Sequence, residues 1–79
     1  MLPERGDAIL YVPSHADGDV HHKDCEVGFV TSVDPARDIA WCRYFHREFP
    51  HNLRTIANSE ATPIANLRIT GKHRVPEGM

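Results

Sequence analysis

Residues 26–45 read EVGFVTSVDPARDIAWCRYF and contain two runs of β-forming residues on either side of a short polar segment. The first run, 26–33, is rich in Val, Phe and Thr, and the second, 39–45, contains Ile, Trp, Tyr and Phe, all residue types that favour extended structure. The segment between them, 34–38, has a proline that presets a turn φ and an aspartate at each end. This stretch therefore predicts two strands joined by a tight turn.

Three shorter strands are expected elsewhere, each beside a turn signal. They lie at 8–12, directly after Gly6-Asp7, somewhere between 54 and 62, and at 67–69. The proline that opens residues 63–67 predicts a single 3-10 turn before the last strand. The polar segments 14–24 and 46–53 are expected to be loops.

A helix over residues 53–67 is the alternative for the weakest of these strands. The apolar residues there fit a helical spacing only in part, and Pro63 interrupts them. We therefore favour a strand in this region. Five short strands separated by turn signals predict an all-β domain, either a small barrel or a sandwich.

The chain has 79 residues, which is the length of one small domain. We expect a single domain at 1–79, with an ordered core at 6–69 and a flexible tail at 70–79. A domain of this size buries only about 60% of its unfolded surface, which favours a binding surface over a deep catalytic cleft.

The cysteine content and the N-terminal residues bear on location. Two cysteines, Cys25 and Cys42, are too few for a secreted disulfide framework, so we expect free thiols in a cytoplasmic, reducing setting. The first seven residues contain no apolar stretch before charged residues occur, unlike a signal peptide. The apolar run 8–12 is far too short to cross a membrane.

The order of the predicted pieces resembles an SH3-like barrel. Such barrels have a Gly-Asp opening into the first strand, a long first loop, a glycine in the second strand and a short 3-10 turn before the last strand. The matching pieces here are Gly6-Asp7, residues 14–24, Gly28 and residues 63–67. The resemblance implies a five-stranded SH3-like β-barrel.

A second resemblance is to small uncharacterised proteins encoded by bacteriophages and prophages. Those proteins carry a Tyr-Val-Pro-x-His-Ala segment and then a His-x-Asp-Cys-Glu-x-Gly segment. The matching segments here are YVPSHA at 11–16 and HKDCEVG at 22–28, and the later segment NSEATP at 58–63 is also similar. The resemblance spans about residues 6–69 except for 46–56. It implies a phage or prophage origin. It does not indicate an activity.

The loop 14–24 and the residues after it gather His15, His22 and Cys25, residue types that bind zinc. We expect no metal and no cofactor, because a fourth ligand is missing. If a metal is present, these three residues are the expected ligands. The alternative interpretation is a polar loop with hydrogen-bonded histidines and a small buried cysteine.

An enzyme would use Cys25 as nucleophile, with His15 or His22 as base and Asp24 to orient the base. All of these residues fall within one short stretch of a very small domain, whereas Cys–His catalysis usually draws its pair from distant parts of a chain. We therefore expect a protein that is not an enzyme.

The half of the chain from Arg37 onward holds seven of the nine basic residues, interleaved with aromatic ones. This composition is typical of a surface that stacks bases and contacts phosphates. The formal net charge of −2 argues against strong binding to nucleic acid. A nucleic-acid-binding accessory protein is therefore the second hypothesis, after a module that binds a protein or peptide partner.

Strand phase decides which residues could bind that partner. Ile39, Trp41, Arg43 and Phe45 share one face of the predicted strand, and residues 40, 42 and 44 share the other. Because an unpaired charge is costly in a small core, we expect the face of Arg43 to point outward and to expose Trp41 beside it. The alternative places Trp41 inside. The predicted binding residues are Trp41, Arg43, Phe45, Tyr11 and His15.

Overall fold

The computed structural model describes residues 2–55 and 58–79. The strands are β1 (Asp7–Tyr11), β2 (Glu26–Asp34), β3 (Ile39–Tyr44), β4 (Glu60–Pro63) and β5 (Leu67–Lys72). Single 3-10 turns are η1 (Ser14–Ala16), η2 (Pro35–Arg37) and η3 (Ile64–Asn66). All helical structure in the described part of the chain consists of these turns, so the prediction of an all-β domain is confirmed.

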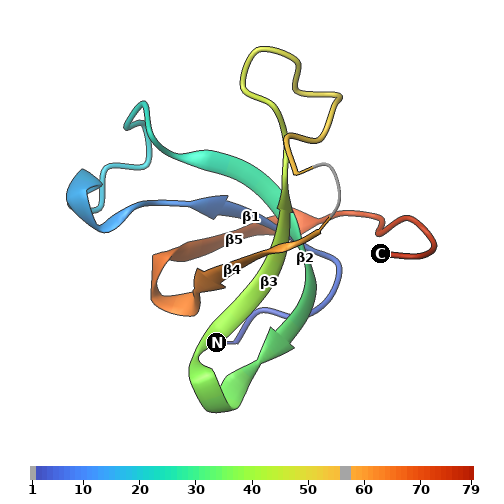
Figure 1. The fold of residues 1–79 in the computed structure, drawn as a ribbon. Coiled ribbons are helices and arrows are strands. Elements are labelled where there is room, and N and C mark those ends of the chain that lie inside the picture. The colour runs from blue at the N-terminus through green and yellow to red at the C-terminus, as the bar shows by residue number, and fades with distance from the viewer. Residues whose placement is uncertain (1, 56–57) are drawn as a thin grey trace.

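The strands form one antiparallel sheet in the order β4-β3-β2-β1-β5 (Figure 1). Strands β4 and β5 lie at its two edges, and no ladder between them is present in the described residues. The sheet is therefore open rather than closed into a barrel. Strands that follow one another along the chain are neighbours from β1 to β4, and only β5 crosses over to pair with β1.

The strand predictions differ from the structure mainly near the C-terminal end. Strand β4 begins only at Glu60, and Ile56 and Ala57, which fall within the expected fourth strand, lie outside the described residues. The described part of 53–67 contains β4 and η3 rather than a helix. Strand β5 continues three residues beyond the expected end, because Lys72 pairs with Asp7 on β1.

The core lies on one face of the sheet. Its buried apolar residues come from four strands: Ile9, Val30, Ala40, Cys42, Tyr44 and Leu67. On β2, Val30 faces Cys42, but after a bulge at Thr31 the next pair is Ser32 with Trp41. This extra residue shifts the alternation by one, and it returns Val33 to the core face opposite Ala40.

The opposite face of the sheet is also covered, which contradicts the predicted outward position of Arg43. Arg43 is only 7% exposed, and its Nη2 donates a hydrogen bond of 2.7 Å to the carbonyl of Thr55. The segment after β3 turns back beside the end of that strand, where Leu53 bridges Phe45 and Arg54 N–H donates to the carbonyl of Tyr44, and so brings Thr55 to the Arg43 side chain. Trp41, on the same face, is half-buried. The prediction assumed that solvent covers one side of the sheet.

Candidate functional site

The connection between β1 and β2 forms a loop that is tied to the rest of the fold. The Asn66 side chain of η3 donates to the carbonyl of Val12 at 3.0 Å and to the hydroxyl of Ser14 at 3.2 Å. Within the loop, Ala16 is buried, and Asp17 adopts a left-handed conformation with φ 52° that ends η1. The side chains of this loop therefore project from an anchored backbone.

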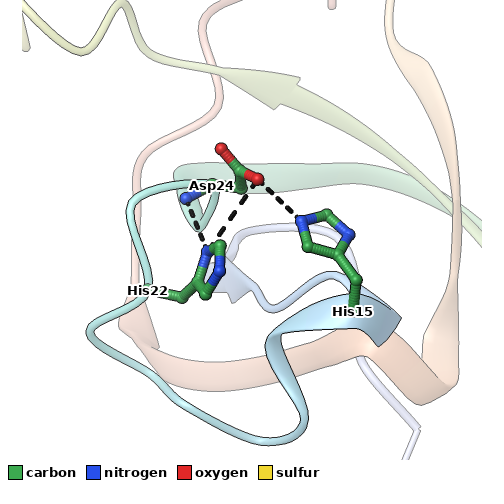
Figure 2. A group of neighbouring side chains, drawn as sticks. All are labelled: His15, His22 and Asp24. Carbon is green, nitrogen blue, oxygen red and sulfur yellow. Dashed lines mark hydrogen bonds and ion pairs between the residues drawn. The ribbon is translucent and has the colours of Figure 1, made fainter.

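Three polar side chains of this loop converge, as Figure 2 shows. His15, on η1, places Nε2 2.6 Å from Oδ2 of Asp24. His22 places Nδ1 3.9 Å from the same oxygen, and it accepts a hydrogen bond of 3.0 Å from the Asp24 amide. The two imidazole rings meet edge to face with centroids 5.2 Å apart. The hydrogen bond from His15 holds the pKa of the Asp24 carboxyl below its usual value.

Cys25 does not belong to this cluster. Its thiol donates to the carbonyl of Asp19 at 3.4 Å, and its amide bonds to the carbonyl of His22. The sequence suggested His15, His22 and Cys25 as the ligands if a metal is present. In the structure, the third side chain beside the two histidines is Asp24 and not Cys25. The hypothetical Cys–His pair of an enzyme is not formed in the described residues, because both histidine rings point toward Asp24.

A second candidate site lies on the covered face of the sheet, where two adjoining hollows share Phe45 and Pro50. One hollow, of about 340 Å³, is lined by Cys25, Val27, Phe45, His46, Arg47 and Pro50. The other, of about 390 Å³, is lined by Phe29, Phe45, Pro50, His51, Leu53, His73 and Pro76. We call this pair of hollows the outer groove.

Aromatic packing forms the floor of the outer groove. Phe29 is buried, and the ring of His73 stacks on it with centroids 4.5 Å apart. Phe45 lies against both rings, at 5.9 Å from Phe29 and 5.5 Å from His73. Val27, which lines the groove, is 57% exposed. Phe49, whose ring lies 5.2 Å from that of the groove residue His46, is 58% exposed, which leaves a solvent-facing apolar surface beside the groove.

The predicted binding residues do not form one surface. Phe45 lines the outer groove, and His15 belongs to the loop cluster. Tyr11 lies in a separate hollow of about 180 Å³, with its ring edge-on to Tyr44. Trp41 borders a shallow depression near Thr31, Ser32 and Ser59, and Arg43 is buried, as described above.

The binding residues predicted from the sequence did not include Val27 and Pro50, which line the outer groove. Val27 is two positions before buried Phe29, so strand alternation places both on one face. The strand phase alone could not show that a later loop would bring Pro50 against the same face.

Three basic side chains of the described residues, Arg37, Arg54 and Lys72, pair with carboxylates. Arg54 donates to Glu26 and Glu60, each at 2.8 Å, and thereby links β2 to β4. Arg37 pairs with Asp34 at 2.7 Å. Lys72 contacts Glu4 and Asp7. Three of the seven basic residues from Arg37 onward are therefore held in ion pairs.

The chain matches no protein-family model, no curated protein and no solved structure. Over its described residues, the chain has no helix of the length and apolar character needed to span a membrane.

Proposed function

We propose that this chain is a non-enzymatic interaction module that binds an extended peptide segment of a protein partner in the outer groove. The observation that carries this proposal is an apolar groove with an aromatic floor, with the exposed side chain of Val27 in its lining and the exposed ring of Phe49 next to His46 beside it. Hollows lined by apolar and aromatic side chains, with a few polar groups at the edge, are typical of binding sites.

The groups around the groove favour a peptide of particular chemistry. Arg47 is exposed, and three histidines, His46, His51 and His73, line the groove. Glu48 is the acidic residue of the adjoining loop segment 46–54. An extended segment that places one apolar side chain over Phe45 and a carboxylate near Arg47 would match both the shape and the charge of the site.

The proposal includes an SH3-like fold type, with the barrel open between the edge strands β4 and β5, and a phage or prophage origin. Its support is the strand order with a long first loop and a 3-10 turn before the last strand, together with the sequence resemblance at 11–16 and 22–28. A cytoplasmic location belongs to the same proposal and is supported by the two free thiols of Cys25 and Cys42.

Binding of nucleic acid is the second candidate. The clustering of basic residues after Arg37 in the sequence supports it, whereas the ion pairs of Arg37, Arg54 and Lys72 weaken it. Salt-sensitive mobility shift of RNA or single-stranded DNA, without any peptide binding, would favour this candidate over the first.

Selection from a displayed random peptide library tests the proposal directly. The immobilised intact chain is expected to select peptides that share an apolar residue beside Asp or Glu. Fluorescence polarisation of one selected peptide then gives the affinity. Val27→Lys is expected to weaken binding about 30-fold, the effect of losing about 2 kcal/mol at a hot spot.

Ile69→Lys is the matched control, because Ile69 is also an exposed apolar strand residue, at 42% exposure, but lies on β5. It is expected to leave the affinity unchanged, and thermal unfolding verifies that both variants are folded. A selection without consensus, or equal affinity of the Val27→Lys variant and the unmodified chain, would refute a peptide site in the outer groove.

A further inference from the structure

The loop cluster has the composition and spacing of a metal site. One ligand atom from each of His15, His22 and Asp24 can be chosen so that all three lie within 4.8 Å of one another. In tetrahedral zinc sites with bonds of about 2.0–2.2 Å, ligand atoms lie about 3.4 Å apart. The distances from Asp24 Oδ2, 2.6 Å to His15 and 3.9 Å to His22, fall on either side of that spacing. Small ring rotations would therefore bring the three atoms to a common centre.

We infer that His15, His22 and Asp24 form a three-ligand site for a divalent transition metal such as Zn²⁺ or Co²⁺, with solvent in the remaining position. Two imidazoles and one carboxylate favour these metals over Mg²⁺ and Ca²⁺, which take oxygen ligands. The side chains are 63%, 27% and 40% exposed, in the order given, so an ion can enter from solvent.

The anchored backbone prepares this arrangement before any ion binds. Consecutive turns carry the chain from η1 to β2, with hydrogen bonds from Asp19 N to the Ala16 carbonyl and from His22 N to the Asp19 carbonyl. The Asn66 side chain ties the start of the loop to η3. Because the turns already hold the ligands close together, binding orders little additional chain.

Metal binding would exchange one set of contacts for another. The hydrogen bond between His15 and Asp24 gives way to two metal bonds, and the Asp24 amide can turn to water if His22 binds through Nδ1. With three protein ligands in an exposed loop, the ion exchanges with the buffer. Protein purified without added zinc is thus expected to carry less than about 0.2 equivalents, well below a closed four-ligand site.

Titration of the full-length chain with Co²⁺ and then with Zn²⁺ tests the site. We expect one equivalent of Co²⁺ to give the visible absorption of a four-coordinate ion, without the near-ultraviolet charge-transfer band of a thiolate ligand. Zn²⁺ should displace the Co²⁺ at one equivalent and with micromolar affinity. A Co²⁺ spectrum typical of a six-coordinate ion, absorbance that does not saturate at one equivalent, or a thiolate charge-transfer band would overturn the assignment.

Single substitutions then identify the ligands. His15→Ala, His22→Ala and Asp24→Asn are each expected to weaken zinc binding by at least about 100-fold, because loss of even an outer partner of a ligand costs about 10–100-fold. His21→Ala and Cys25→Ser are matched controls from the same loop and should leave the affinity within about twofold, since neither residue is a ligand. Circular dichroism verifies the fold of each variant. Unchanged zinc affinity in the Asp24→Asn variant would refute this ligand set. So would a loss of zinc affinity in the two controls as large as the loss in the ligand variants.

Discussion

The backbone carbonyl of Arg43 occupies the space where residue 28 would carry a Cβ. A Cβ built on Gly28 would lie 2.2 Å from that oxygen and 2.9 Å from Cδ1 of Tyr44. The two residues are on paired strands, where Gly28 faces Tyr44. Glycine at position 28 therefore allows β2 and β3 to approach where β2 enters the core.

Gly28→Ala is expected to destabilise the fold by about 3 kcal/mol, because the carbonyl belongs to the backbone and cannot move aside without disturbing the sheet. Gly71→Ala on β5 is the matched control, since a Cβ there meets no atom within 4 Å. Its free energy of unfolding in urea should stay within about 0.5 kcal/mol of the unmodified chain. Equal stability of the two variants would contradict the close approach.

Arg43→Ala separates the observed burial from the surface position that the sequence suggested. Loss of the packed side-chain stem and of the hydrogen bond to Thr55 is expected to cost about 2–3 kcal/mol in a urea titration. Arg68→Ala, an exposed arginine on β5, should change stability by less than about 0.5 kcal/mol. If Arg43→Ala lowers the free energy of unfolding as little as Arg68→Ala does, Arg43 lies at the surface.

Asp7 makes stability depend on pH in the acid range. Its buried carboxylate accepts hydrogen bonds from Lys72 and from the Glu4 amide, and these lower the pKa of Asp7 below its ordinary value of 3.8. A depressed pKa in the folded state gives stability that is fully present above the unfolded pKa and is lost as pH falls through the folded one. The free energy of unfolding should therefore decline below about pH 4.

Asp7→Asn should remove part of that decline and cost about 1–3 kcal/mol at neutral pH, where the charged acceptor is lost. Urea titrations between pH 3 and pH 7 measure both effects. Glu77→Gln, an exposed carboxylate of the tail, is the control and should reproduce the unmodified profile. Identical profiles for Asp7→Asn and the unmodified chain would contradict this role of Asp7.

The hydroxyls of Tyr44 and Thr62 form a buried hydrogen bond of 2.6 Å between β3 and β4. Either Tyr44→Phe or Thr62→Val leaves the other hydroxyl without this partner and should cost about 1–2 kcal/mol. The double variant should be less destabilised than the sum of the single ones, by about 1 kcal/mol, because no buried hydroxyl then remains alone. Strict additivity in the double-mutant cycle would show that the two groups do not interact.

The local elements of this fold could be predicted from the sequence. The β-forming runs, the turn at Asp34-Pro35 and the 3-10 turn after Pro63 depend on each residue's own backbone preferences and on those of its immediate neighbours. The core positions of Ala40, Cys42 and Tyr44 also followed, since alternation along a strand requires only the strand itself.

Arg43 and Asp24 show what local patterns could not determine. Arg43 is buried where the segment after β3 turns back beside that strand and brings the Thr55 carbonyl to its side chain, and only the assembled chain shows that contact. Asp24 faces His15 because successive turns reverse the backbone between them, whereas Cys25, the next residue, points to the Asp19 carbonyl. The outer groove likewise joins Val27 to Pro50 across a long separation in the sequence. Residue types and strand phase determined what each segment can form, but which side chains meet depends on contacts between distant segments, and only the tertiary structure decided those.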